Sequence, residues 1–173
     1  MSRNLAAFLA MLAHAEGTDQ VADPYACCFA YKHTVKDMRD HPAVTGEWAG
    51  ERLTEQQCMG LGLGKRCVST AAGKYQITRG TWVDLRRLIV LPDFGPASQD
   101  KAAAKLIEME GALQDVEAGR IAQAIDKCKS RWASLPGANA PGQPQRKLEG
   151  LLAFYARDLA RREREAVMVE SGR

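Results

Sequence analysis

Residues 5–19 read LAAFLAMLAHAEGTD, an apolar helical stretch that ends in a carboxylic acid followed by a glycine. Four of these residues fall close to one line on a helix of 3.6 residues per turn: Leu5, Leu9, Leu12 and Glu16. Because that line is otherwise apolar, we expect Glu16 on the side of the helix that faces the core. Asn4 is the predicted N-cap and Gly17 the predicted C′ residue, which places Glu16 in the last helical turn.

Glu16 is the first candidate for a catalytic residue. Burial raises the pKa of a carboxylic acid, and the negative end of the helix dipole also disfavours its anion. An acid held protonated near neutral pH can protonate the leaving oxygen of a glycosidic bond. The alternative is a structural role, in which Glu16 ends the helix and pairs with a nearby Arg or Lys. The residues alone leave both interpretations open.

The composition is that of one globular domain spanning residues 1–173. Of the 173 residues, 46% are hydrophobic and 26% are charged, which excludes a largely disordered or fibrous chain. The net charge of +3 favours approach to an anionic surface such as a bacterial wall or nucleic acid, without choosing between them. The longest apolar stretch, Leu5–Ala13, is nine residues, so we expect no stable membrane insertion. No nucleic-acid partner is expected, because Arg161–Glu165 is mixed in sign and no basic stripe is present.

The five cysteines contain no C-x-x-C pair, which argues against a secreted disulfide framework. Cys128 lies on an apolar helical stripe and is predicted to be a small buried hydrophobe. Cys58 and Cys67 bracket a segment long enough to close a hairpin and to join their sulfur atoms in an oxidising compartment. A zinc site would draw on adjacent cysteines and a histidine: Cys27, Cys28, and His33 or His41. Adjacent cysteines do not easily face one tetrahedral ion, so we predict no metal and no cofactor.

The pattern of apolar and turn-forming residues predicts the other elements. Residues 20–76 scatter Gly, Pro, Thr, Asp and aromatics through short apolar runs, which is typical of a small sheet and irregular loops. Helices return after Thr78 and after Pro96, and the second ends at Gly111. A short helix to Gly119 precedes the helix that carries the apolar stripe.

A loop and a last helix follow. Ser134–Pro144 carries prolines and glycines between two helices, so it is predicted to be a surface loop suited to border a cleft. The last helix is predicted to bury Leu148, Leu151, Leu152, Tyr155 and Leu159. The predicted architecture is therefore α+β, mostly helical, with a small sheet or hairpin region in the first half of the chain.

A second chemical candidate is the strip from Ser69 to Gln76, in which small residues precede an aromatic and an amide. The ring of Tyr75 can stack on a sugar face, and the amide of Gln76 can donate and accept hydrogen bonds. The hydroxyl groups of Ser69 and Thr70 offer further polar contacts. The alternative is an ordinary turn with a core tyrosine, which the residues support at least as well.

A series of motifs runs through the chain in one order: Ala7–Ala13 with Glu16–Asp19, Asp40–Pro42, Ser69–Gln76, Asp93–Phe94 with Pro96, Ser98–Asp100, Gly111–Leu113 and Trp132–Ala138. In this order they resemble the lambda-type phage endolysins, lytic transglycosylases also called lambda lysozymes. The resemblance runs from about Ala6 to Tyr155, and ordered matches on that scale are hard to obtain by chance. It implies a lysozyme-like fold in which the small sheet flanks a glycan cleft.

The resemblance also implies a reaction. The family cleaves the β-1,4 bond between N-acetylmuramic acid and N-acetylglucosamine without consuming water, leaving a 1,6-anhydromuramoyl end. Glu16 would first be the acid and then the base. A hydrolytic muramidase acting on the same bond needs a second carboxylate, for which Asp19, Asp23 and Asp37 are the candidates. Phage hydrolases of that kind carry an aspartate where this chain has Tyr25. A wall-binding module without activity is the non-enzymatic alternative.

Site residues and partners follow from the same resemblance. Tyr75 and Gln76 fall on the cleft-lining motif and are expected to contact sugar, with Ser69 and Thr70 beside them. The implied partners are the glycan strands of peptidoglycan, bound by a monomer. We expect the protein to wait in the host cytoplasm until a pore-forming holin gives it access to the periplasm and cell wall. The glycine-rich segment between Cys58 and Cys67 is unlike the family pattern and is interpreted as a cleft lip.

Overall fold

A computed structural model of the chain describes residues 1–138 and 145–171. The described α-helices are α1 (Arg3–Glu16), α2 (Pro42–Thr45), α3 (Glu55–Gly60), α4 (Arg79–Leu88), α5 (Pro96–Met109), α6 (Leu113–Glu117), α7 (Ile121–Cys128) and α8 (Leu148–Ser171). Three short 3₁₀ turns, Thr18–Gln20, Pro24–Ala26 and Phe29–Tyr31, follow α1. The described strands are β1 (Glu51–Arg52) and β2 (Val68–Ser69). The predicted α+β class, mostly helical with a small early sheet, is confirmed.

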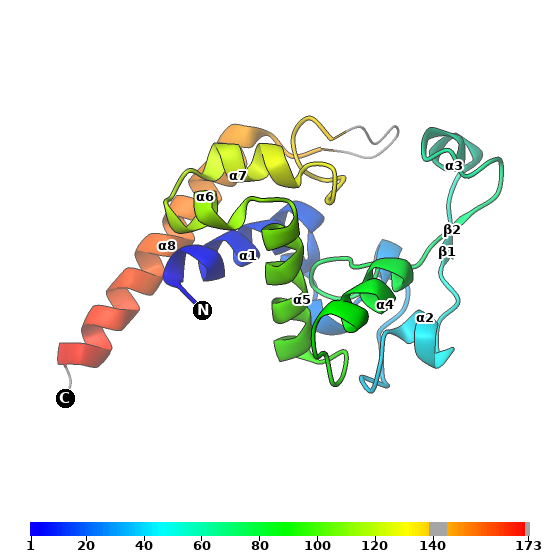
Figure 1. Cartoon of the computed structure of the whole chain (residues 1–173), viewed down its shortest axis with the longest axis horizontal. Helices are drawn as coiled ribbons and strands as arrows, with labels where there is room; N and C mark the ends of the chain where they lie inside the picture. The colour runs from blue at the N-terminus through cyan, green and yellow to red at the C-terminus, as the bar shows by residue number, and fades with distance from the viewer. Residues whose placement is uncertain (139–144, 172–173) are drawn as a thin grey trace.

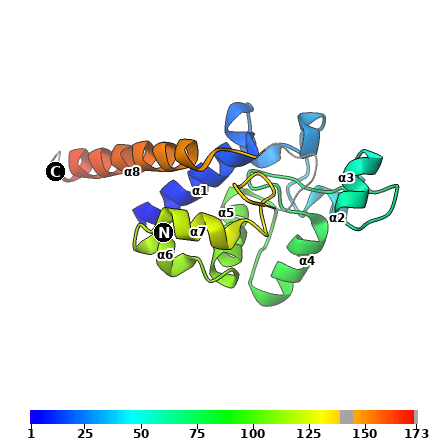
Figure 2. The same cartoon turned by 90° about the horizontal axis from the view of Figure 1, so that it is seen from above.

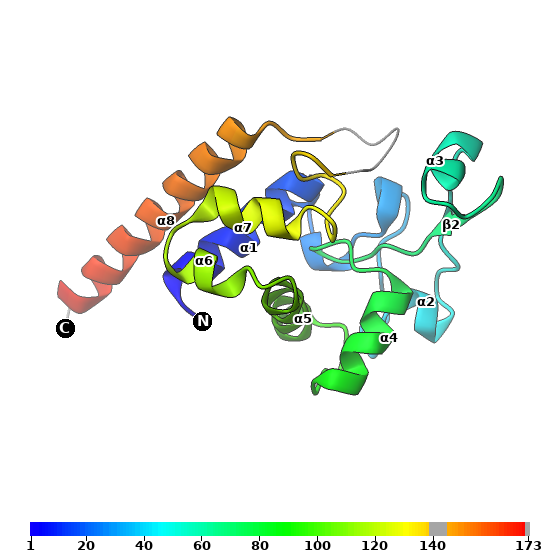
Figure 3. The ribbon, with the colours of Figure 1, turned by 45° about the horizontal axis from the view of Figure 1, so that its top comes forward.

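The helix α1 is central to the molecule and α8 packs along it (Figure 1). Seen from above, α8 runs beyond the body at one end, while α3 lies at the opposite end (Figure 2). The strands β1 and β2 connect α3 to the body, and they pair antiparallel with Glu51 opposite Ser69 and Arg52 opposite Val68 (Figure 3). No described helix is long and apolar enough to cross a membrane.

The ends of α1 follow from its capping residues. Gly17 ends the helix with a φ of 76°, in the left-handed region that favours glycine, so that prediction is confirmed. The predicted N-cap Asn4 is wrong, because the helix begins at Arg3 and the hydroxyl oxygen of Ser2 accepts from the amide of Leu5 at 3.0 Å. The side chain of Asn4 instead donates to the carbonyl of Glu117 at 2.7 Å.

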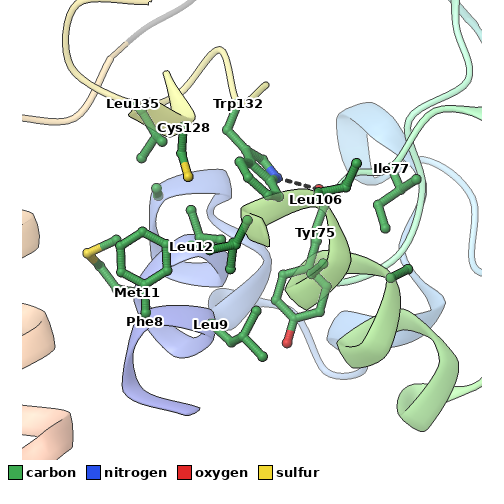
Figure 4. Close-up of a cluster of buried hydrophobic side chains, with 14 of the residues drawn as sticks. Phe8, Leu9, Met11, Leu12, Tyr75, Ile77, Leu106, Cys128, Trp132 and Leu135 are labelled. Carbon is green, nitrogen blue, oxygen red and sulfur yellow. Dashed lines mark hydrogen bonds between the residues drawn. The ribbon is translucent and has the colours of Figure 1, made fainter. Parts of the chain in front are cut away.

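The core gathers around α1 (Figure 4). Its largest fully buried side chains include Trp82, Tyr75, Phe8, Phe94, Met11 and Leu12. Full burial of one such side chain contributes about 1.5–3 kcal/mol, so this cluster holds α1 firmly in the core. Cys128, at the end of α7, is 0% exposed and packs in the same cluster, as its apolar stripe predicted.

The later helices begin where their capping residues predict. The hydroxyl of Thr78 caps α4, and Pro96 occupies the first turn of α5. In α8, Leu151 and Tyr155 are buried, whereas Leu148 is 39% exposed. The prediction for Leu148, the first residue of α8, is therefore wrong, while Leu152 and Leu159 are half-buried against the core. The predicted loop Ser134–Pro144 lies partly outside the described residues, since 139–144 are not described.

The segment between the strands contains α3 and a disulfide bond between Cys58 and Cys67, whose Cα atoms are 5.6 Å apart. The sequence left this bond as an option for a closed hairpin. The structure differs in that the bridged segment begins as a helix, which Thr54 and Gln57 start with a reciprocal capping box.

Candidate active site

Glu16 is the last residue of α1 and lies half-buried in a cleft. Two cavities, of about 440 Å³ and 630 Å³, make up this cleft, and Glu16, Phe29 and Gln76 line both of them. Each has the size of a binding site for a small molecule. The helix therefore delivers a carboxyl group to the junction of two cavities.

Burial raises the pKa of Glu16 from 4.5 to about 7, and a hydrogen bond from Ser134 opposes this shift. The direction and its main cause confirm what the apolar line of α1 predicted. A carboxyl group with a pKa near 7 is divided between its two protonation states at neutral pH. It can therefore both give and take a proton during one reaction cycle.

Ser134 holds the carboxyl group from the opposite wall of the cleft. Its hydroxyl donates to Oε1 of Glu16 at 2.6 Å. The turn that carries Ser134 is fixed by Trp132, whose indole Nε1 donates to the carbonyl oxygen of Tyr75 at 3.0 Å (Figure 4). Leu135, on the other side of Ser134, is 0% exposed. Two buried neighbours thus orient one small polar side chain toward Glu16.

The carbonyl groups at the end of α1 have partners as well. The hydroxyl of Tyr31 donates to the carbonyl oxygen of Glu16 at 2.6 Å, and Nε of Arg146 donates to that of Ala15 at 3.4 Å. Ala30 and Tyr31 have φ values of 62° and 57°, which are uncommon for residues other than glycine. This strained turn places the Tyr31 ring over Gly17, where an added Cβ would lie 2.9 Å from its hydroxyl oxygen.

Three of the residues predicted to contact sugar line the cleft. Gln76 borders both cavities with Glu16, and Ser69 and Thr70 border the larger one. Gln76 has a φ of 49°, and its Nε2 donates to the carbonyl oxygen of Gly73 at 2.9 Å. The strip thus brings its polar residues to the same place as the acid.

Tyr75 is the exception within the strip. Its side chain is 1% exposed and packs in the core, where its hydroxyl donates to Oδ1 of Asp100 at 2.6 Å. A ring without exposed surface offers no face to a sugar, so the predicted stacking role is corrected to a structural one. The interpretation that fits is the alternative given by the sequence, a turn with a core tyrosine. What Tyr75 provides near the site is its backbone carbonyl, which positions Trp132.

A second carboxylate is absent from the described lining of the cleft, where Glu16 is alone. Oδ2 of Asp19 is 2.7 Å from Nδ1 of His14, and Asp23 accepts from the amide of Tyr25. Asp37 forms an exposed ion pair with Arg39 at 2.7 Å. None of the three candidates from the sequence therefore shares the cleft with Glu16.

The residues considered for zinc are engaged elsewhere. Nε2 of His33 lies 2.9 Å from Glu47, and that of His41 lies 3.0 Å from the carbonyl oxygen of Ile77. Cys27 and Cys28 are buried, free cysteines. Within residues 1–138 and 145–171, no group of three or more His, Cys, Asp or Glu side chains is arranged to hold a metal ion.

Sequence reasoning found Glu16 but missed Ser134, Tyr31 and Arg146. Ser134 belongs to the Trp132–Ala138 motif, so the sequence marked the segment without giving the hydroxyl a role. Tyr31 and Arg146 contact the end of α1 through backbone carbonyls, and no motif in the sequence carries that information.

Comparison with known proteins agrees with this geometry. The family model described as Endolysin matches residues 6–161. The endolysin of Escherichia phage P2 is 37% identical over 153 residues, which cover 88% of this chain and 91% of the relative. The endolysin of Escherichia phage lambda is 36% identical over 153 residues, covering 86% and 87%.

A solved structure of bacteriophage lambda lysozyme complexed with a chitohexasaccharide superimposes with a TM-score of 0.74 at 34% identity, covering 91% of this chain and 95% of that one. A second structure of lysozyme from bacteriophage lambda gives a TM-score of 0.71 at 32% identity, with the same coverage. These matches cover most of the chain, which therefore belongs to the endolysin family and is a lambda-type, lysozyme-like member of it.

Proposed function

We propose that this endolysin is a lytic transglycosylase, which cleaves the β-1,4 bond between N-acetylmuramic acid and N-acetylglucosamine and leaves a 1,6-anhydromuramoyl end. Membership of the family makes it a peptidoglycan-degrading phage enzyme, and the proposal concerns its chemistry. The observation that carries the proposal is Glu16, the one carboxylate in the described lining of the cleft, with its pKa raised to about 7.

The first step uses the protonated form of Glu16. Its proton passes to the glycosidic oxygen, the bond from that oxygen to C1 of the muramoyl ring breaks, and positive charge develops at C1. The leaving sugar departs with a free hydroxyl group. Glu16 is now a carboxylate, and the hydrogen bond from Ser134 stabilises it in this form.

The second step uses the same carboxylate as a base. The C6 hydroxyl of the muramoyl residue attacks C1, and its proton passes to Glu16. An internal ether between C6 and C1 forms, and the acid returns to its starting state without consuming water. Inverting and retaining hydrolases divide these roles between two carboxylates, whereas this scheme needs one. A pKa near neutrality suits a group that serves in turn as acid and base.

The polar residues of the cleft are proposed to contact the glycan. Gln76 borders both cavities beside Glu16, so its amide can bind hydroxyl or N-acetyl groups on either side of the cleaved bond. Ser69 and Thr70 line only the larger cavity and are assigned to one side. A glycan occupant is supported by the lambda relative, whose structure contains a chitohexasaccharide.

The proposed biology follows that of a lytic enzyme of a phage. The protein acts as a monomer, accumulates in the host cytoplasm and reaches the periplasm and cell wall when a holin opens the membrane. The bond between Cys58 and Cys67 forms once the enzyme has entered that more oxidising compartment.

The products of digestion test the chemistry. Purified peptidoglycan is digested and the soluble muropeptides are weighed by mass spectrometry. We expect products that are one water lighter than hydrolytic ones. We also expect these products to be lost in Glu16→Gln. Fully hydrated reducing ends would establish a hydrolytic muramidase instead. Glu16→Gln that retains wall binding but not lysis also distinguishes an enzyme from an inactive wall-binding module, for which the variant would change nothing.

A further inference from the structure

A separate cavity of about 610 Å³ lies next to the cleft, among residues of β1, β2 and the segment between them. Figure 3 shows that the ribbon of β2 and α3 forms one end of the molecule. We call it the hairpin pocket, and its lining consists of Arg52, Leu53, Lys65, Arg66, Cys67 and Val68. Two of these residues, Leu53 and Val68, also line the larger cavity of the cleft, so the two spaces adjoin.

The described lining of the hairpin pocket contains three cationic side chains and no carboxylate. Arg52 pairs with Val68 across the two strands, and Arg66 lies two positions before Val68 in the chain. Like charges that line one cavity repel one another, and a bound anion would offset this repulsion. The arrangement is therefore expected to attract a negatively charged group.

Several arginines elsewhere in the described chain have carboxylate partners, among them Arg86 with Asp40, Arg120 with Asp115 and Arg131 with Glu110. The cations of the hairpin pocket lack strong partners of this kind. Within the described part of the chain, Arg52 and Arg66 have no carboxylate within ion-pair distance, and Lys65 approaches Glu55 only at 3.5 Å. In that pair both side chains are more than half exposed, at 78% and 58%, which makes it weak.

The pocket is built on a braced scaffold. The amide of Leu53 donates to the carbonyl oxygen of Cys67 at 3.1 Å, extending the pairing of the strands. The disulfide between Cys58 and Cys67 ties the same position to α3. Leu53 and Val68 add apolar surface beside the cations. The site thus combines guanidinium groups, which bind carboxylates through paired hydrogen bonds, with a surface for small aliphatic groups.

We infer that the hairpin pocket binds the peptide stem of peptidoglycan, through the free carboxylates of that peptide. This inference rests on the proposed function, because it needs a muramoyl residue in the adjoining cleft. The lactyl group of muramic acid carries a short peptide that combines methyl groups with free carboxylates. Arg52 and Arg66 bind the carboxylates, and Leu53 and Val68 contact the aliphatic part. Cleavage then favours glycan that carries its peptides over bare glycan.

Two substrates prepared from the same peptidoglycan test this inference. One is soluble glycan with its peptide stems, and the other is glycan from which an amidase has removed them. The test variant is Arg52→Gln with Arg66→Gln, which removes both guanidinium groups and retains polar side chains. The matched control is Arg157→Gln with Arg164→Gln, which removes the same charge from exposed positions on α8 that do not line either cavity of the cleft.

For the test variant we expect kcat/KM on stem-bearing glycan to fall about tenfold, mainly through KM, while kcat/KM on bare glycan stays within about twofold. The control should lose little on either substrate. Stem peptide released by the amidase should inhibit the wild type and not the test variant. Equal losses on both substrates, no loss on either, or an equal loss in the control would each overturn the inference.

Failure of the proposed chemistry is visible separately. Product ends that carry a full water, or activity that survives Glu16→Gln, would contradict the transglycosylase mechanism whatever the ratio between the two substrates. A normal product mass with an unchanged substrate ratio would instead contradict only the peptide-binding role of the hairpin pocket.

Discussion

Ser134 donates a 2.6 Å hydrogen bond to the carboxyl group of Glu16, although the two residues are 118 positions apart in the sequence. The contact joins the end of the first helix to the turn after α7 across the cleft. It acts on the acid in the opposite direction to burial, since it favours the carboxylate. The balance between these two effects sets the pKa that both steps of the proposed reaction need.

Substitution of Ser134 should therefore move the pH dependence of the enzyme. In Ser134→Ala the carboxylate loses its donor, so the pKa of Glu16 rises above about 7. The alkaline limb of the pH profile of kcat/KM, which reports loss of the proton from Glu16, should shift to higher pH. The maximal rate should fall several-fold, because the carboxylate formed in the first step loses the hydrogen bond that stabilises it. Ser130→Ala is the control, because Ser130 also borders the larger cavity but bonds to Glu110. A profile that is unchanged in Ser134→Ala would contradict this account.

Gly17 offers a test of the turn that supports the acid. In Gly17→Ala the positive φ of 76° is strained, and the new Cβ lies 2.9 Å from the hydroxyl oxygen of Tyr31. We expect a loss of about 2 kcal/mol or more in the free energy of unfolding, together with a lower kcat as Glu16 shifts. Gly46→Ala is matched, since its φ is 83° but an added Cβ meets nothing within 4 Å. Urea unfolding measures the cost of backbone strain in both variants, and kcat measures whether Glu16 has been displaced. A loss of activity in Gly46→Ala would contradict the assignment of the lower kcat to displacement of Glu16.

The sequence located the acid because local rules suffice for it. An apolar line with a 3.6-residue period followed by Gly17 predicts both the helix and the position of Glu16 at its end. The starts of α4 and α5 were predictable for the same reason, from Thr78 and Pro96. These features depend on residues within one or two turns of each other.

Features that depend on distant contacts were not predictable. Nothing near Ser134 indicates that its hydroxyl meets the end of α1, because that contact exists only in the folded chain. Ser2 and Asn4 are both good capping residues two positions apart, so local preference alone does not identify Ser2 as the N-cap. The side that Tyr75 faces was ambiguous, since the irregular segment around it has no period to separate core from cleft.

The structural role of Tyr75 predicts that substitutions of Tyr75 and Gln76 have different effects, the first on stability and the second on substrate binding. Tyr75→Phe removes the buried hydrogen bond to Asp100, so the free energy of unfolding should fall by about 1–2 kcal/mol with KM unchanged. Gln76→Asn keeps an amide and tolerates the φ of 49°, but its shorter side chain should raise KM several-fold with little effect on stability. Thermal unfolding and steady-state kinetics distinguish the two. A raised KM in Tyr75→Phe would restore a sugar contact for that residue.

The disulfide predicts a local effect at the lip of the cleft. Cys58 and Cys67 are nine positions apart, and closing a loop of this length contributes about 2.5 kcal/mol in the entropic model. Leu61 and Leu63 inside the loop line the larger cavity, so a reductant should lower kcat/KM and speed proteolysis between residues 59 and 66. The double variant Cys58→Ser with Cys67→Ser should behave like reduced wild type and ignore the reductant. Equal sensitivity of the double variant to reductant would contradict this assignment.

The raised pKa of Glu16 also has a consequence for stability. Its value is about 7 in the folded protein and 4.5 as the reference for the unfolded chain. Between these pH values the folded protein holds a proton that the unfolded chain has released, so the free energy of unfolding falls as pH rises through this window. Above pH 7 the full effect applies and reaches about 3 kcal/mol, taking about 1.36 kcal/mol for each pKa unit.

Glu16→Gln removes this ionisation while keeping a side chain of similar size. The variant should match the wild type in stability near pH 4.5 and exceed it by about 3 kcal/mol at pH 8, as measured by urea unfolding at the two pH values. A difference that is the same at both values would mean that the acid is not held protonated by burial. Glu16→Gln is thus expected to gain stability at high pH and to lose activity. Both effects have one cause, because the apolar surroundings that disfavour the carboxylate also keep a proton available for the glycosidic oxygen.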